Sequence, residues 1–420
     1  MRLIYTLLWV LALPAVLARL LWRSRRQPGY ASAIGERFGR YATPSGGPWL
    51  WLHAVSVGET RAAQPLVDAL ALRYPTHRIV LTHMTPTGRE TAQSVFGRHG
   101  ERVVSAYLPY DLPWLQRRFL RHFSPQIGIV METEVWPNLM AACQDLGVPC
   151  ALVNARLSAR SANRYRRLIA LARETFGRFA VVAAQSEGDA ARLRQIGAHA
   201  PVVTGNLKFD MALPPAALTL GTDWRSRIGP RPVMLAASTR EGEEALVLDA
   251  FHAHPAHDSA LLVIVPRHPQ RFDDVAKLAT ERGLRVARRS AGTLPGADTQ
   301  VWLGDSMGEM AAYYTLADVV LMGGTWLPFG GQNLIECCAV GRPVLLGPHT
   351  YNFSDASDAA LDAGAGLRFA TVADAMGEAF ELLADTPRRK AMGEAGCRFT
   401  RQHGGATART VALLTPLIDG

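Results

Sequence analysis

Short, almost continuous apolar segments alternate with longer mixed segments along most of the chain. Apolar runs of this length, bounded by turn residues, predict buried strands, and the mixed segments between them predict helices. In the first half the predicted strands are 49–54, 78–82, 126–131, 150–154 and 181–184. In the second half they are 233–237, 261–265, 301–303, 319–322 and 344–346. Alternation of this kind predicts an α/β protein whose parallel sheets are covered by helices on both faces.

The alternation breaks between about Lys208 and Gly229. Residues 211–220 are rich in Ala, Leu and Pro without clear periodicity, and we interpret them as part of an interdomain linker. A chain of 420 residues is long enough for two or three domains. We therefore expect two doubly wound domains with a ligand cleft at the carboxyl ends of their strands. The expected parts are 1–26, 27–210, 211–229 and 230–420.

The N-terminus differs in kind from the rest of the chain. Residues 3–18 carry no charge, Arg19 follows, and arginines concentrate at 23–26. A membrane span needs about 20 apolar residues, so this segment either crosses with Arg19 reaching the interface or lies partly in the interface. A cleaved signal peptide is the alternative, although no Ala-x-Ala site follows the run. Because positive residues stay on the cytoplasmic side, we interpret 1–26 as an anchor whose following domains face the cytosol.

Overall charge narrows the class of partner. Lys and Arg number 45 and Asp and Glu 36, an excess of 9 that favours phospholipid, phosphorylated substrates or nucleic acid. Basic runs with interleaved aromatics are missing from the sequence, so we expect no nucleic-acid partner. The five cysteines form neither a disulfide framework nor a zinc-ligand spacing, as is typical of a reducing compartment.

The segment 317–348 carries the clearest candidate chemistry. An apolar strand ends in a glycine pair, and a second pair, Gly330 and Gly331, precedes a predicted helix with Glu336 about one turn inside it. Glycine lets a ligand approach the backbone, a helix N-terminus attracts phosphate, and a carboxylate can hold two ribose hydroxyls. These parts predict a nucleotide site. The alternative is an ordinary strand–loop–helix turn.

Other candidates follow the remaining strands. Arg267, held between two prolines, suits phosphate because the guanidinium fork matches its geometry, although it can also be a surface arginine. Glu132 and Glu134 are neighbouring carboxylates at a buried strand end, where burial or repulsion raises a pKa, and both functional and structural roles are open. Ser56 and Ser238 can simply cap helices. In that interpretation the nearby acids, Glu59, Glu241 and Glu243, complement the helix dipoles.

An ordered set of short motifs runs along nearly the whole chain. They are 35–39, 56–60, 85–88, 107–111, 131–138, 154–158, 204–210, 266–269 and 330–336. In these motifs the chain resembles the 3-deoxy-D-manno-octulosonic acid (Kdo) transferases of lipopolysaccharide assembly. The resemblance implies a GT-B fold, with two Rossmann-like domains, a cleft between them and an N-terminal membrane-anchoring helix. It implies acceptor binding in the first domain and CMP-Kdo binding in the second.

The resemblance also implies the reaction and the residues that perform it. It predicts transfer of Kdo from CMP-Kdo to a lipid A precursor, lipid IVA, on the cytoplasmic face of the bacterial inner membrane, with release of CMP. Glu36 matches the general base. Glu132 and Glu134 match an acidic strand-end motif and are the other expected catalytic residues, with the choice of the essential one open. The expected donor-site residues are Ser238, Arg267, Met307, Gly308, Glu309, Gly331, Asn333 and Glu336. The expected acceptor or anion-binding residues are Ser56, Gly58, Arg37 and Lys208.

We expect no metal or other cofactor, because a monophosphate leaving group needs less counter-charge than a diphosphate and no Asp-x-Asp pair lies in a suitable loop. Two other functions remain open. A GT-B-like nucleotide-sugar epimerase would use a similar scaffold without an anchor or a base beside it. A non-catalytic membrane protein would bind nucleotide or anionic lipid without turnover.

Overall fold

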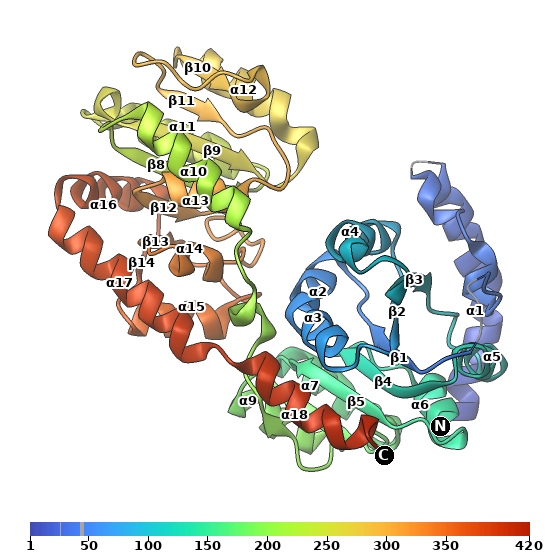
Figure 1. Ribbon diagram of the computed structural model, residues 1–420. Coiled ribbons are helices and arrows are strands. Elements are labelled where there is room, and N and C mark those ends of the chain that lie inside the picture. Colours follow the sequence, from blue (N-terminus) through green and yellow to red (C-terminus); the bar gives the residue numbers. More distant parts are fainter. Residues whose placement is uncertain (26, 43–45) are drawn as a thin grey trace. The chain divides into compact units, whose positions relative to one another are not determined.

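The computed structural model of the chain describes residues 1–25, 27–42 and 46–420 (Figure 1). It contains two compact units, residues 1–211 together with 403–420, and residues 212–402. Each unit is built around a seven-stranded sheet in which all neighbouring strands are parallel. The expected pair of Rossmann-like units is therefore confirmed. Arg26, one of the arginines of the expected anchor, lies outside the described residues.

The sheet of the first unit has the strand order β3-β2-β1-β4-β5-β6-β7. Its strands are β1 (Trp49–His53), β2 (Arg78–His83), β3 (Val103–Tyr107), β4 (Pro125–Met131), β5 (Cys150–Ala155), β6 (Val181–Ala184) and β7 (Val202–Val203). Its main helices are α2 (Val57–Ala62), α3 (Gln64–Arg73), α4 (Pro86–Phe96), α5 (Pro113–Phe123), α6 (Pro137–Asp145), α7 (Ala159–Arg166), α8 (Ile169–Phe176), α9 (Glu187–Gln195) and α18 (Ala406–Ile418). Short 3-10 helices include η1 (Pro28–Tyr30), η2 (Ile34–Phe38) and η4 (Leu207–Asp210).

The sheet of the second unit has the order β10-β11-β9-β8-β12-β13-β14. Its strands are β8 (Val233–Thr239), β9 (Leu261–Pro266), β10 (Val286–Arg288), β11 (Val301–Leu303), β12 (Val319–Met322), β13 (Val344–Leu346) and β14 (Gly366–Arg368). Its helices are α10 (Pro215–Ile228), α11 (Glu243–Ala253), α12 (Phe272–Glu281), α13 (Met310–Leu316), α14 (Ile335–Ala339), α15 (Ser354–Asp362), α16 (Val372–Ala384) and α17 (Thr386–His403).

All predicted strands are present, and the four that the apolar pattern missed share one property. They are β3, β7, β10 and β14, the two edge strands of each sheet. An edge strand has a partner on one side only, so it needs fewer apolar side chains than a central strand. The sequence shows this in Ser105 within β3 and in the three-residue segment Val-Ala-Arg of β10.

The C-terminal segment corrects one expected domain boundary. Helix α18 covers one face of the first sheet, and its Leu414 and Ile418 are buried with Leu66 and Leu70 of α3. Burial of each such side chain contributes about 1.5–3 kcal/mol, which is enough to fix the helix there. Residues 403–420 thus belong to the first unit, so the expected domain 230–420 was too long at its end.

The expected linker 211–229 is also wrong, since most of it forms α10 in the second unit. Trp224 is buried in ring contacts with Trp302 and Tyr313, each at 5.1 Å between centroids. Gly221, one turn before it, lets α10 approach α13 so closely that a Cβ atom would lie 2.4 Å from the carbonyl oxygen of Ala312. Two prolines, Pro214 and Pro215, start the helix. Proline at a helix start is a sequence signal for a helix, and the linker interpretation did not use it.

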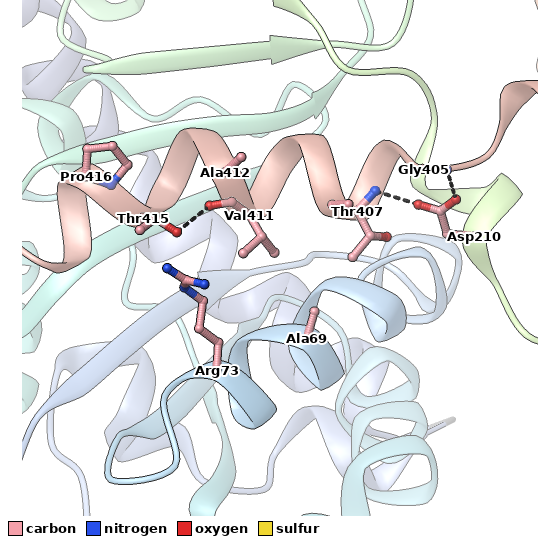
Figure 2. Close-up of a pocket in the computed structure, with 10 residues that line it drawn as sticks. Ala69, Arg73, Asp210, Gly405, Thr407, Val411, Ala412, Thr415 and Pro416 are labelled. Atoms are coloured by element: carbon pink, nitrogen blue, oxygen red, sulfur yellow. Dashed lines mark hydrogen bonds between the residues drawn. The ribbon is translucent and has the colours of Figure 1, made fainter.

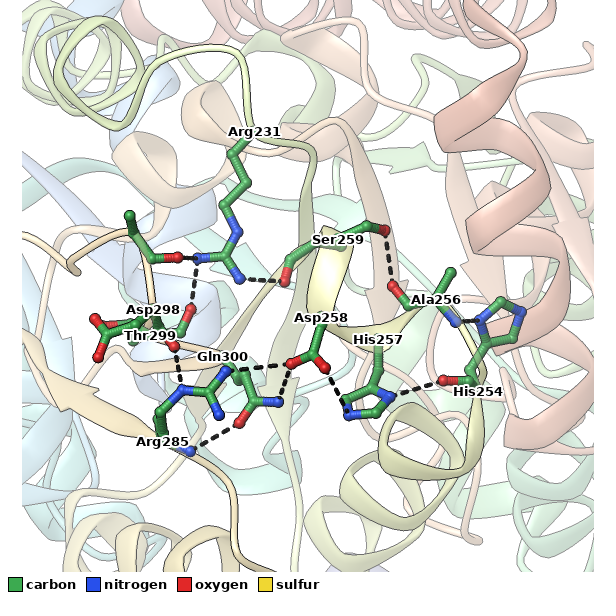
Figure 3. Close-up of polar contacts among 12 residues, drawn as sticks. Arg231, His254, Ala256, His257, Asp258, Ser259, Arg285, Asp298, Thr299 and Gln300 are labelled. Carbon is green, nitrogen blue, oxygen red and sulfur yellow. Dashed lines mark hydrogen bonds and ion pairs between the residues drawn. The ribbon is translucent and has the colours of Figure 1, made fainter.

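Polar contacts close the amino ends of the strands in the second unit (Figure 3). The Arg231 guanidinium donates to the carbonyl oxygens of Ala260 at 2.7 Å and Ala297 at 3.1 Å. Arg285 pairs with Asp258 at 3.2 Å, and its backbone N–H donates to Gln300 at 3.0 Å. These side chains bind the segments that precede the strands. The opposite edge of the sheet, at the carboxyl ends of the strands, is therefore the edge available for ligands.

One helix among the described residues, α1 (Arg2–Ser24), is long and apolar enough to cross a membrane by length and composition. Its sequence position matches the expected anchor. The five cysteines are all described, and each is a free thiol.

Candidate functional site

The strand order of each sheet reverses at one position, and the loops that leave the sheet there carry many of the predicted residues. In the first unit the reversal lies between β1 and β4, and in the second between β8 and β12. Loops on either side of such a switch point diverge and leave room for a ligand. Ser56 and Glu132 follow the first pair of strands. In the second pair, Ser238 is the last but one residue of β8, and Gly331 lies in the loop after β12.

Ser56 and Glu59 form a capping box at the start of α2. The Ser56 hydroxyl accepts from the backbone N–H of Glu59 at 3.3 Å and donates to the Glu59 carboxylate at 2.8 Å. The other carboxylate oxygen accepts from the N–H of Val55 at 2.8 Å. The capping role predicted for Ser56 is confirmed.

Three carboxylates lie in electrostatic contact at this switch point. Burial raises the pKa of Glu59 to about 7, and repulsion from Glu132 and Glu134 adds to the shift. Burial, together with Glu132, also raises the pKa of Glu134. Lys208 partly balances the negative charge, with its Nζ 3.9 Å from a Glu132 oxygen. The sequence predicted a raised pKa at the Glu132–Glu134 pair but not at Glu59. With a pKa of about 7, the Glu59 carboxyl can exchange a proton near neutral pH.

Left-handed backbone conformations help to position these groups. Glu132 directly follows β4, and Asn154 is the last but one residue of the neighbouring strand β5. Their φ angles are 54° and 51°. The Asn154 side chain accepts from the backbone N–H of Leu207 at 3.0 Å and so holds η4, which carries Lys208. Asparagine tolerates this conformation better than most residues. The position of Asn154 at a strand end was the sequence signal for this role.

Two histidines near the same edge act as structural groups. Burial lowers the pKa of His53 to about 3 and that of His83 to about 4, so both are neutral at physiological pH. The Nδ1 atom of His53 lies 2.8 Å from the Thr82 hydroxyl, and that of His83 lies 2.8 Å from the carbonyl oxygen of Ala54. These bonds connect the ends of β1 and β2.

Glu36 lies at a different part of this edge, at the end of β3. Its carboxylate receives two hydrogen bonds from Arg89, at 2.8 and 3.1 Å, and a third from the backbone N–H of Tyr107 at 2.8 Å. Three strand spacings separate β3 from β4, or about 14 Å. The structure therefore does not bring Glu36 together with Glu132 and Glu134.

Arg37 is buried, with 2% of its surface exposed. Its guanidinium lies 4.0 Å from the centre of the Tyr107 ring and donates to the carbonyl oxygen of Met84 at 3.3 Å. The cation thus faces the interior of the unit, and its expected contact with an acceptor or anion stays a prediction. Arg40, three residues further on, is exposed.

In the second unit, Glu243 connects the two loops of the switch point. Its buried carboxylate accepts from the backbone N–H groups of Arg240 at 2.9 Å, Gly324 at 2.6 Å, Trp326 at 2.9 Å and Leu327 at 3.3 Å. Glu243 begins α11, as predicted for a residue that complements the helix dipole. Its contacts with the loop after β12 were not predicted, because they join residues about 80 positions apart.

Basic side chains gather after β8 and β9. The Arg240 guanidinium lies 4.4 Å from the centre of the Phe329 ring. Burial, followed by the charges of Arg240 and Arg267, lowers the pKa of His268, so the three groups are neighbours. Arg267 is exposed, and its backbone N–H is fixed to Thr239 at 2.9 Å. This arrangement suits an anionic ligand such as a phosphate.

The glycine segment differs from its prediction in one respect. No helix opens at Gly331; α14 begins four residues later and has only five residues. Gly330 and Gly331 instead have φ of 92° and 87°, and a Cβ atom on Gly330 would lie 2.4 Å from Asn352. So short a helix has a small dipole, which weakens the predicted phosphate site at its N-terminus.

Other predicted donor residues form two groups within the second unit. The Asn333 amide donates to Glu336 at 3.0 Å, in the first turn of α14. The Ser238 hydroxyl contacts the sulfur of Met310 at 3.7 Å, beside the loop that carries Met307, Gly308 and Glu309. The carboxylate of Glu309 forms a double ion pair with Arg289, at 2.9 and 3.1 Å, so it also has a structural function.

A groove of about 750 Å³ between α3 and α18 lies outside this arrangement (Figure 2). Asp210 accepts from the backbone N–H groups of Gly405 and Thr407 at its end and so caps α18. None of the predicted site residues lines the groove. Over residues 1–25, 27–42 and 46–420, no three His, Cys, Asp or Glu side chains are grouped as metal ligands.

Comparison with known proteins gives consistent matches. Residues 32–211 match the family model described as 3-deoxy-D-manno-octulosonic-acid transferase (kdotransferase). The chain is 48% identical over 407 residues to a 3-deoxy-D-manno-octulosonic acid transferase of Bordetella pertussis, a match that covers 94% of each chain.

Two solved structures share the fold. A glycosyltransferase from Rickettsia africae aligns with a TM-score of 0.61 and 13% identity, covering 89% of this chain and 99% of its own. A UDP-GlcNAc 2-epimerase from Neisseria meningitidis aligns with a TM-score of 0.61 and 16% identity, covering 88% of this chain and 100% of its own. A transferase and an epimerase match equally well, so the GT-B-like fold is confirmed but does not distinguish the two activities.

Proposed function

Because the chain belongs to the family of 3-deoxy-D-manno-octulosonic acid (Kdo) transferases, we propose that it transfers Kdo from CMP-Kdo to a lipid A precursor, lipid IVA, and releases CMP. The observation that carries this proposal is the 48% identity over 94% of both chains. An epimerase shares the fold at 16% identity only. The chain is thus a glycosyltransferase, and the donor and acceptor are the proposed part.

We assign CMP-Kdo to the carboxyl edge of the second sheet. Arg267 and Arg240 would receive the negative charge that grows on the phosphate as the bond between the sugar and CMP breaks. Glu336, oriented by Asn333 at 3.0 Å, would accept from ribose hydroxyls. Met307 and Gly308 would lie against the cytosine ring of CMP. No metal is required in this scheme, because the leaving group is a monophosphate.

We assign the deprotonation of the acceptor hydroxyl to Glu36. A carboxylate has about four acceptor positions, and the hydrogen bonds from Arg89 and Tyr107 fill three of them. One position remains for the hydroxyl proton. The deprotonated oxygen would attack the anomeric carbon of Kdo while CMP departs with the bonding electrons. Glu59 and Glu134, whose pKa values are raised, are the alternative bases.

We place the enzyme at the cytoplasmic face of the bacterial inner membrane, with α1 as its anchor. The apolar composition of α1 supports this location. The exposed residues Arg23, Arg25 and Arg40 would then lie near the phosphorylated head of the lipid acceptor. Removal of residues 1–22 should release much of the protein from membranes and leave binding of CMP intact.

Incubation of purified membranes with CMP-Kdo and a tetraacylated lipid A precursor, followed by mass measurement of the lipid, tests the function. The expected result is a lipid heavier by one or more Kdo residues, and the mass shows how many. Free Kdo without a heavier lipid would indicate hydrolysis instead. CMP binding without turnover would favour a non-catalytic protein, and an isomerised sugar nucleotide would favour an epimerase.

A further inference from the structure

Helix α1 packs against the first unit with one face along most of its length. This inner face repeats every three or four residues, which is the spacing of one helix side. It meets the buried side chains of Tyr110, Leu112 and Leu115. The residues of α1 that pack there are Trp9, Leu13, Val16 and Leu17.

Specific contacts fix the helix to the unit near both of its ends. The Thr6 hydroxyl donates to the side-chain oxygen of Asn138 in α6 at 3.1 Å. The ring of Trp9 lies 6.0 Å from that of Tyr110 and 6.1 Å from that of Trp136. Towards the other end, the Arg23 guanidinium lies 5.0 Å from the ring of Tyr30. The helix is therefore an integral part of this unit (Figure 1).

The opposite face of α1 is apolar and exposed. Leu3 is 85% exposed, Leu11 68% and Leu8 60%. Exposed apolar surface of this extent on one side of a helix marks an interaction site. The large apolar residues on this outer face are Leu3, Ile4, Leu7, Leu8, Val10, Leu11, Leu21 and Trp22.

Positive charge borders the outer face. Arg19, Arg23 and Arg25 are exposed near the C-terminal end of the helix, and Arg2 lies at its start. Among the described residues of α1 there is no Asp or Glu to balance them. An apolar face with a basic border matches the boundary between acyl chains and anionic head groups.

Helix length alone permits either of two arrangements in a membrane. Its 23 residues extend about 35 Å, enough for a hydrocarbon core of about 30 Å. A spanning helix that kept its inner contacts would draw α5 and α6 into the hydrocarbon. These helices carry the exposed ion pair of Arg117 and Asp145, and each charge would cost about 2.5–3.5 kcal/mol there. A helix that spanned alone would instead leave Leu112, Leu115 and Trp136 without their covering.

We propose that α1 does not cross the bilayer but lies in its interface, with the outer face inserted into one leaflet of an anionic phospholipid membrane. This inference rests on the membrane location proposed above and narrows it to interfacial binding. The membrane would then contact the first unit directly, because α1 is part of the fold of that unit.

Flotation with vesicles tests the surface. Full-length protein should bind vesicles of phosphatidylcholine with phosphatidylglycerol more tightly than vesicles of phosphatidylcholine alone. The double variant Leu7→Glu with Leu11→Glu should bind at least about tenfold more weakly, because each carboxylate would have to leave water. Leu72→Glu is the matched control: Leu72 is an 84% exposed leucine of α3, away from this face, and should leave binding unchanged. Equal binding by the double variant would overturn the proposal.

Cysteine labelling decides between interfacial and spanning arrangements. In a Cys397→Ser background, which removes the cysteine that is not buried, we place the label at Arg2, in the basic border at the start of the helix and not on the inserted face. Arg2→Cys should react with a membrane-impermeant maleimide in inverted vesicles and not from the periplasmic side of intact cells. Labelling from the periplasmic side would show that the helix crosses the membrane and would sink the proposal. A soluble, fully active protein would instead refute the membrane location itself. A dimer formed through the same face, detected by light scattering, would overturn the proposal. Kdo transfer assayed in detergent stays independent of each of these outcomes.

Discussion

Glu36 and Arg89 form a two-point ion pair, with oxygen–nitrogen distances of 2.8 and 3.1 Å, at the end of β3. The pair joins a 3-10 helix shortly after α1 to the first half of α4, 53 residues later in the chain. Because both residues are mostly buried, the pair holds the Glu36 carboxylate in one orientation. A general base needs that kind of fixed orientation to meet an acceptor hydroxyl.

Glu36→Gln should lower Kdo transfer by a factor of about 10² or more, since it keeps the shape of the side chain and removes its basicity. CMP binding should stay nearly unchanged, because Glu36 lies in the first unit and the proposed donor residues lie in the second. Turnover at saturating lipid and donor is the measurement. A near-normal rate would assign the base to Glu59 or Glu134.

Arg89→Ala should lower transfer less than Glu36→Gln, and the two changes should not be additive. In a double-mutant cycle we expect a coupling free energy between about 0.5 and 3 kcal/mol, because the two side chains are direct partners. Arg98→Ala, which removes a more exposed ion pair with Asp68, is the control and should have little effect on turnover. Additive losses would mean that Arg89 does not act through Glu36.

Arg267→Ala should weaken CMP binding by about 1.5–3 kcal/mol through the loss of a charge-assisted contact with phosphate. Calorimetric titration with CMP measures the effect. Arg282→Ala in the same unit removes an arginine paired with Asp249 and should leave CMP affinity as it was. If Arg267→Ala binds CMP as tightly as the unchanged protein while remaining folded, Arg267 has only a structural role.

Glu243→Ala should destabilise the second unit by at least about 3 kcal/mol, because four backbone N–H groups would lose their acceptor in a buried site. The free energy of unfolding from denaturant titration is the readout. Glu241→Ala removes a neighbouring exposed carboxylate and should change stability by less than about 0.5 kcal/mol. Similar losses in both variants would contradict the role assigned to Glu243.

Glu59 should make the first unit less stable as the pH rises from about 4.5 to about 7. Its pKa is raised to about 7 in the folded chain from 4.5, so ionisation in this window costs the folded state more than the unfolded state. Between pH 4.5 and 7.5, Glu59→Gln should lose less stability than the unchanged protein, by up to about 3 kcal/mol. Denaturant titrations at both pH values measure this difference. Glu90→Gln, at an exposed position of α4, is the control, and equal slopes for all three proteins would exclude a buried carboxyl at Glu59.

The local pattern of the chain was sufficient for most of the secondary structure. Central strands are buried on both faces, so their apolar runs were visible in the sequence, whereas edge strands such as β3 and β14 were not. Helix α10 was missed because its contacts depend on one tryptophan and one glycine, Trp224 and Gly221, and not on a wide apolar stripe.

The sequence by itself determined the fold class, the apolar N-terminal helix and the strand-end loops in which the candidate residues lie. These properties follow from local periodicity and from the geometry of parallel sheets. Only the tertiary structure decided which of those residues meet. It paired Glu36 with Arg89, buried Arg37, brought Glu59 to Glu132 and Glu134, and used Glu243 to join two loops. Burial and long-range contacts set these relationships, and neither can be obtained from the spacing of residues along the chain.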